Sequence, residues 1–385
     1  MIQATAVFAQ SYRQLRSQKM FYFSLVITIM IVAAFACVGI SDENLTIFGK
    51  NFRKIKTFFK IFGFGDNQSP TAADIYKLLF MKIGVGMWLT WGASILGLIS
   101  VSGLVPDMMK GREIQMTLSR PISRTKLFLL KYLSGLLFVG LQITIFIVLA
   151  FILIKIKTGD FIFELFWGIP LVLLFFSYLY SISVFFGALT KSMLASLLLT
   201  ILCWMILAGI SLTDSALRMF KIGNTLEVAA TEMEIAHTQN LKLATYNPLS
   251  QKSKKELKIK REEYNDRISS LQDSLKVQKE DLWQTTSWET GIYYIKTIFP
   301  KTSETTDMLY KQVVKGFGEV NQDIDSKTNP REMYERGMSV AKKMEIIRKA
   351  DNLDRTSIFW VLGTSCIFEA FMLAFAIYLF NKKDF

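Results

Sequence analysis

The sequence predicts an all-α membrane protein: a polytopic six-helix transmembrane bundle with a large, mainly helical insertion between spans five and six. Hydrophobic residues make up 51% of the 385-residue chain, and the mean hydropathy is +0.32. Six apolar stretches each reach about 20 residues, the length that a helix needs to cross the hydrocarbon core. The alternating pattern of barrel strands is absent, so we expect the spans to be helices, whose backbone polar groups pair internally.

The six apolar stretches run approximately over residues 20–40, 78–105, 127–154, 161–188, 193–213 and 357–380. The predicted domains follow from them: a cytoplasmic interfacial helix (1–19), a membrane part with spans one to five (20–213), an extracytoplasmic helical domain (214–355), and the sixth span with a cytoplasmic tail (356–385). Within the membrane part, we expect an outer loop at 41–77 and a polar cytoplasmic loop at 106–126.

Charge predicts the orientation. The short segments assigned to the cytoplasm are rich in lysine and arginine, and only Asp107, Glu113 and Asp384 oppose them. This is the positive-inside pattern, which places both termini in the cytoplasm and the chain in the cytoplasmic (inner) membrane as a multi-pass protein. The outer loop 41–77 also carries lysines, which runs against the pattern.

The basic excess belongs to the membrane part. Residues 214–355 hold 24 basic and 22 acidic side chains, so most of the net charge of +13 lies elsewhere. This distribution argues against a nucleic-acid-binding domain and favours contact with anionic lipid headgroups.

Part of the insertion shows a heptad repeat. Its apolar residues occupy two seam positions, with charged residues between them: Leu257, Tyr264 and Leu271 at one, Ile268, Leu275 and Leu282 at the other. This spacing predicts an antiparallel helical hairpin or a short coiled coil, with Arg261 breaking the seam. A solvated helix within a small domain is the alternative.

Two polar side chains lie inside predicted spans. Glu369 is about halfway along the sixth span, and Gln142 is near the middle of the third, at a comparable depth. An intramembrane carboxylate is costly and is a functional candidate. We expect a Gln142–Glu369 hydrogen bond, with Glu369 either a protonated group in a helix contact or part of a polar substrate path.

Catalytic, metal and cofactor sites are not expected on this chain. His237 is the one histidine, and Cys37, Cys203 and Cys366 all fall in predicted spans. No metal or haem ligand set, histidine-based triad, disulfide framework or dinucleotide fingerprint is indicated. The sequence also lacks the phosphate loop with which many ATPases bind ATP.

Four features carry a family resemblance: the interfacial helix, the turn at 188–192, the tail at 381–385, and a motif after the second span. That motif reads Leu118-Ser119-Arg120-Pro121-Ile122-Ser123-Arg124, followed by Lys131 at a position from which it can reach the same face. With them, the chain resembles the permease subunits of ABC exporters of the second export class. The permeases linked to nitrous oxide reductase assembly and to gliding motility are the most similar subgroup.

The resemblance implies two six-span permease subunits, identical or related, and two copies of a separate ABC ATPase that carries ATP and Mg²⁺. The 106–126 loop would transmit ATPase motion to the spans through Asp107, Arg112, Glu113, Arg120, Pro121 and Arg124. Proline supplies a fixed turn, and arginines donate forked hydrogen bonds to acidic partner groups. Contact with lipid headgroups is the alternative for these arginines.

The insertion at 214–355 is larger than the short loop that many such permeases have there. An ATPase-coupled mechanical transducer, which acts on an extracytoplasmic envelope partner through this domain, is therefore a second hypothesis. A membrane scaffold unrelated to ABC transporters is a third. Pro170 inside the fourth span predicts a kink.

Overall fold

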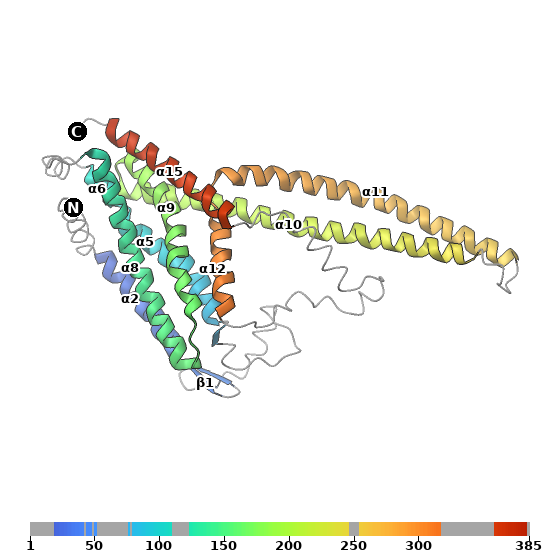
Figure 1. The fold of residues 1–385 in the computed structure, drawn as a ribbon, viewed down its shortest axis with the longest axis horizontal. Coiled ribbons are helices and arrows are strands. Elements are labelled where there is room, and N and C mark those ends of the chain that lie inside the picture. The colour runs from blue at the N-terminus through green and yellow to red at the C-terminus, as the bar shows by residue number, and fades with distance from the viewer. Residues whose placement is uncertain are drawn as a thin grey trace. The chain divides into compact units, whose positions relative to one another are not determined.

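The computed structural model describes residues 19–41, 44–47, 50–51, 76–77, 79–109, 123–245, 254–316 and 358–382. The fold is all-α apart from a small sheet. The helices are α2 (Lys19–Ala36), η1 (Phe80–Gly92), α5 (Ala93–Val101), α6 (Leu104–Met108), α8 (Arg124–Thr158), η2 (Phe163–Trp167), α9 (Gly168–Thr190), α10 (Met193–Ala244), α11 (Lys254–Ile298), α12 (Thr302–Gly316) and α15 (Ile358–Lys382) (Figure 1). The predicted helices at 1–19 and 331–350 lie outside the described residues, except for Lys19.

Five helical stretches are long and apolar enough to cross a membrane. They are Phe80–Met108, Arg124–Thr158, Phe163–Thr190, Met193–Ala244 and Ile358–Lys382. The first predicted span corresponds to α2, whose apolar part, Tyr22–Ala36, is shorter than these five. Five spans therefore rest on helix length and composition in the structure, and the first predicted span stays a prediction.

The loop predicted at 41–77 begins with strands. β1 (Val38–Ser41), β2 (Asn44–Ile47) and β3 (Lys50–Asn51) form an antiparallel sheet directly after α2. Lys157, in the last turn of α8, donates a hydrogen bond of 2.9 Å to the carbonyl oxygen of Val38. The sheet is therefore tied to the end of α8 opposite the 106–126 loop.

The chain divides into two compact units. Unit 1 comprises Met1–Ala208, Ile298–Ile324 and Ile358–Phe385, and unit 2 comprises Gly209–Thr297 and Asp325–Ser357. This division differs from the predicted domain at 214–355, because α12 belongs to unit 1. Leu309 and Val313 of α12 are buried in the hydrophobic core that the apolar helices share. An amphipathic helix without an apolar run of spanning length thus completes the membrane part.

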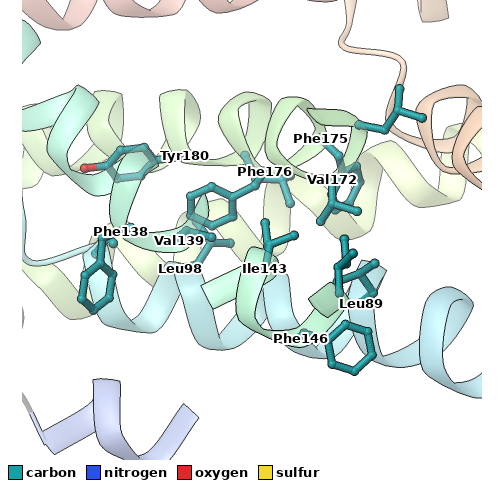
Figure 2. Close-up of a cluster of buried hydrophobic side chains, with 14 of the residues drawn as sticks. Leu89, Leu98, Phe138, Val139, Ile143, Phe146, Val172, Phe175, Phe176 and Tyr180 are labelled. Atoms are coloured by element: carbon teal, nitrogen blue, oxygen red, sulfur yellow. The ribbon is translucent and has the colours of Figure 1, made fainter. Parts of the chain in front are cut away.

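Large side chains from η1, α5, α8 and α9 fill the core of unit 1 (Figure 2). Figure 2 shows Leu89 and Leu98 facing Ile143 and Phe146 of α8, with Phe176 of α9 beside them. Most of these side chains are almost fully excluded from solvent. The spans are therefore held by interdigitated aromatic and branched side chains, which supply close van der Waals contact where lipid offers no hydrophobic driving force.

The kink expected at Pro170 loses its basis, because this proline lies at the start of α9. The short 3₁₀ helix η2 precedes α9, which begins at Gly168, so that Pro170 falls in the first helical turn. Backbone N–H groups in the first turn have no intrahelical partner. Proline is tolerated there because it removes no helical hydrogen bond.

Unit 2 contains the antiparallel pairing of α10 with α11. Residues with higher numbers on α10 bond to residues with lower numbers on α11, as in an antiparallel pair. The bonded pairs are Asp214–Lys296, Lys221–Glu289, Asn224–Thr285, Thr231–Gln278 and Thr245–Arg261. The six apolar residues of the predicted heptad are all partly buried, whereas Lys258, Glu262 and Lys276 between them are exposed. The heptad residues thus lie on one face of α11.

The seam continues past the predicted repeat with polar residues. Gln278 and Thr285 follow Leu271 at intervals of seven, and Glu289 and Lys296 follow Leu282 in the same way. Arg261 also occupies a seam position, where it donates to Thr245 at the end of α10. Polar seam residues at defined positions specify the register of paired helices.

The register predicts which cysteine pairs will form disulfides. The test uses full-length chains in which Cys37, Cys203 and Cys366 are replaced by serine. Asn224→Cys with Thr285→Cys should then cross-link efficiently, because the native side chains are hydrogen-bonded, with Asn224 Nδ2 3.1 Å from Thr285 Oγ1. Asn224→Cys with Gln278→Cys is the control, since seven residues displace the partner by about 10 Å along α11. Non-reducing electrophoresis measures both, and equal cross-linking would contradict the register.

Candidate functional site

A carboxyl group inside the helical bundle is the first candidate site. Tyr132 of α8 donates a hydrogen bond to Glu369 Oε1 at 2.7 Å, and Ser177 Oγ of α9 lies 2.8 Å from Glu369 Oε2. Tyr132 and Ser177 are buried, and Glu369 is half-buried. One carboxyl group thus connects α15 to two neighbouring helices.

Stacked aromatic rings position Tyr132. Its ring lies parallel to that of Tyr180, with centroids 4.9 Å apart, and Tyr180 stacks in turn on Phe176 at 5.7 Å. Gly135 permits this arrangement, because a Cβ atom there would lie 2.5 Å from Tyr180 Oη. The close approach of α8 and α9 at Gly135 therefore sets where the Tyr132 hydroxyl meets Glu369.

The expected Gln142–Glu369 hydrogen bond is wrong. Both amide atoms of Gln142 are buried and have no hydrogen-bond partner among the described residues. Tyr132, ten residues earlier on α8, is the residue at the depth of Glu369, and ten residues correspond to about 15 Å along a helix. The depth prediction failed because α8 is ten residues longer than α15 (35 against 25) and the two helices are bonded at the Arg124–Asn381 end, so their midpoints do not coincide.

The second candidate site is the end of unit 1 at which the 106–126 loop begins and ends. α8 begins after Ser123, whose hydroxyl caps the helix by accepting from the backbone N–H of Lys126. Arg124 donates to the carbonyl oxygen of Asn381, and the Asn381 amide donates to Thr125 at 3.2 Å. The first turn of α8 and the last turn of α15 are therefore bonded to each other.

The other elements at this end lie close together. Asp107 is in α6, which contacts α8 and α9. A Cβ atom at Gly187 would lie 3.1 Å from the Pro106 ring, and one at Gly103 would lie 3.2 Å from the Met193 sulfur. The loop thus leaves the bundle beside the turn between α9 and α10.

The structure describes some of the predicted loop residues. Asp107 and Arg124 lie at this end as expected, whereas Arg112, Glu113, Arg120 and Pro121 are outside the described residues. Lys131 lies on α8 and is 2% exposed, and its reach toward the loop stays a prediction.

A contact that the sequence did not indicate lies before α12. The backbone N–H of Lys301 donates to Ser365 Oγ at 2.9 Å, and the Lys301 ammonium lies 4.5 Å from the centre of the Trp360 ring. Lys301 and Ser365 are fully buried. A lysine in a charged segment of the sequence is expected to have a solvated side chain. The contact of Lys301 with α15 is therefore visible only in the tertiary structure.

No group of three or more His, Cys, Asp or Glu side chains that could hold a metal ion occurs within the described ranges. The chemistry of the two sites is hydrogen bonding by hydroxyl, carboxyl, amide and guanidinium groups. No family model, curated protein or solved structure matches the chain.

Proposed function

We propose that this chain is the permease subunit of an ATP-driven ABC exporter, coupled to a separate ATPase through the 106–126 loop. The supporting observation is the bond between Arg124, where the loop ends, and Asn381 at the end of α15. A force on the loop can pass directly to α15, which also carries Glu369 and Ser365. Five candidate membrane-spanning helices supply the membrane part that such a subunit requires.

In this proposal, ATP closes the dimer of ATPase subunits, and the loop transfers that motion to α8 and α15. The ATPase holds ATP and Mg²⁺, and a second permease subunit completes the complex. Both termini and the loop face the cytoplasm of a bacterial-type inner membrane. The substrate moves across or out of that membrane.

An ATPase-coupled mechanical transducer is the second candidate function. The α10–α11 pairing favours it, because buried partners such as Asp214–Lys296 and Lys221–Glu289 fix the helices against sliding. A paired-helix element of fixed register transmits force better than a flexible loop. Full transport by a chain in which residues 225–285 of the paired helices are deleted would count against this function.

Co-purification tests the proposal. A tagged chain isolated from its native membrane in mild detergent should bring a stoichiometric phosphate-loop ATPase, identified by mass spectrometry. Pro121→Gly combined with Arg124→Glu should abolish that association, because it removes the fixed turn and reverses a loop charge. Lys276→Glu is the matched control, since this lysine is exposed on α11 and its loss should leave the ATPase bound. A clean sample without an ATPase would contradict the proposal.

A further inference from the structure

The density of charge along α11 changes abruptly at Trp283. Of the 29 residues 254–282, 15 are charged, whereas residues 283–297 contain two charged residues, Glu289 and Lys296. The stretch of α10 that faces residues 283–297 is 209–224, because Asp214 bonds to Lys296 and Asn224 bonds to Thr285. We call residues 209–224 and 283–297 the base of the α10–α11 pair, and both stretches belong to unit 2.

Every charged side chain of the base is bonded to another one within it. The five residues form three ion pairs, Asp214–Lys296, Asp214–Arg218 and Lys221–Glu289. Beyond the base, the side chains of the described ion pairs between the two helices are about half exposed: Lys279–Glu232 and Arg267–Glu234. Charged groups that pair with one another between helices are typical of segments that lie in an apolar phase.

The outer surface of the base carries large apolar side chains instead of charges. At least half of each of these side chains is exposed: Trp283, Trp288, Tyr294 and Ile295 on α11, and Leu212, Met219 and Phe220 on α10. Trp283 and Tyr294 are about three helical turns apart, and Trp288 and Ile295 about two, so the exposed residues form rows along α11. Single exposed apolar residues are normal on a protein surface, but a contiguous patch marks an interaction site.

A row of side chains along α10 indicates what covers this patch. Leu198, Met205, Leu212 and Met219 recur at intervals of seven residues, or about two turns, and each is at least 66% exposed. The first two lie in the apolar beginning of a candidate spanning helix, where exposed apolar side chains meet lipid. The row continues into the base without a charged residue. Tryptophan and tyrosine, which the base presents on α11, are enriched where membranes meet water.

We propose that the base of the α10–α11 pair is immersed in one leaflet of the membrane, where its aromatic rings contact the glycerol and acyl region of the phospholipids. The membrane boundary on α10 then lies beyond Met219, and not at residue 213, where the apolar stretch of the sequence ends. The ion pairs of the base lie between the helices, shielded from the lipid. Because the contact is apolar, a zwitterionic phospholipid suffices for it. The proposal does not depend on the transporter function.

Fluorescence quenching in vesicles tests the depth of the base. Full-length chains with Cys37, Cys203 and Cys366 replaced by serine each receive one new cysteine, which is labelled with a fluorophore. The variants are Met219→Cys, Trp288→Cys and the matched control Lys276→Cys, and they are reconstituted in phosphatidylcholine vesicles. All three native side chains are exposed in the structure, so exposure alone predicts the same quenching at each position.

A phospholipid with a nitroxide on its acyl chain should quench the labels at positions 219 and 288 several-fold more than the label at position 276. Iodide, present on both sides of the vesicle membrane, should show the opposite preference. Equal iodide quenching at all three positions would overturn the proposal, because the base would then lie in water. Protection of positions 219 and 288 from both quenchers would overturn it too, because a second copy of the chain would then cover the patch instead of lipid.

Discussion

Asp214→Ala should lower the free energy of opening of the α10–α11 pairing by about 3–5 kcal/mol, the usual cost of breaking a buried ion pair. Asp214 Oδ2 accepts from Lys296 at 2.8 Å and from Arg218 at 3.1 Å. The Asp214 and Lys296 side chains are 2% and 8% exposed. Removal of the carboxylate takes the bonded anion away from Lys296, which is nearly excluded from water, and from Arg218, whose side chain is 29% exposed. Hydrogen exchange of the α10 and α11 backbone in the full-length chain measures the opening.

An exposed ion pair between the same helices is the control. Lys279 lies 2.8 Å from Glu232, as close as the buried pair, but the two side chains are about half exposed at 54% and 51%. Glu232→Ala should therefore cost at most about 1 kcal/mol. The combined replacement of Asp214→Leu, Arg218→Met and Lys296→Met should restore most of the loss, because apolar groups of similar volume then leave no buried charge. Equal effects of Asp214→Ala and Glu232→Ala would contradict this explanation.

Gly135→Ala should destabilise unit 1 by about 1–3 kcal/mol, the usual cost of overpacking a filled core. The new methyl carbon would lie 2.5 Å from Tyr180 Oη and 2.8 Å from Cζ of the same ring. Tyr180 cannot easily move, because it is 1% exposed and stacked between Tyr132 and Phe176. α8 and α9 must then separate, which strains the contacts of Glu369. Thermal unfolding in detergent measures the loss.

Gly140→Ala on the same helix is the matched control. A Cβ atom there would lie 3.5 Å from Leu173, which is ordinary van der Waals contact, so the unfolding temperature should be unchanged or slightly raised. Tyr180→Phe should recover part of the Gly135→Ala loss, because it removes the nearest atom, and Tyr180 Oη has no hydrogen-bond partner among the described residues. Similar losses in Gly135→Ala and Gly140→Ala would contradict the Tyr180 contact as the cause, because alanine has the higher helix propensity and its contact at position 140 is ordinary.

The positions of the long apolar helices were predictable from the sequence, because the length and composition of a segment determine whether it can cross a membrane. The predicted stretches from the second onward all correspond to candidate spanning helices. The face of α11 that meets α10 was predictable for the same kind of reason, since a heptad is a local pattern. Its continuation through Glu289 and Lys296 was not, because a polar seam resembles a solvated helix until its partners are known.

Tertiary partners could not be predicted from the sequence. The choice of Gln142 for Glu369 relied on both residues lying near the middle of their spans, whereas α8 is ten residues longer than α15 and the two helices are bonded at one end. The assignment of α12 to the insertion relied on its charged surroundings, whereas Leu309 and Val313 place it in the core of the apolar helices. The tight contact at Gly135 depends on a tyrosine 45 positions away in the chain.

Site-specific photocrosslinking in the native membrane tests the central claim, that the 106–126 loop is the surface that binds an ATPase. One photoreactive residue replaces Glu113 in that loop, and another replaces Thr46 of β2, in the sheet that is tied to the opposite end of α8. We expect the probe at position 113 to capture a phosphate-loop ATPase and the probe at position 46 to capture none. Capture of no ATPase at position 113, or equal capture at both positions, would contradict the assignment of this chain as an ATPase-coupled permease.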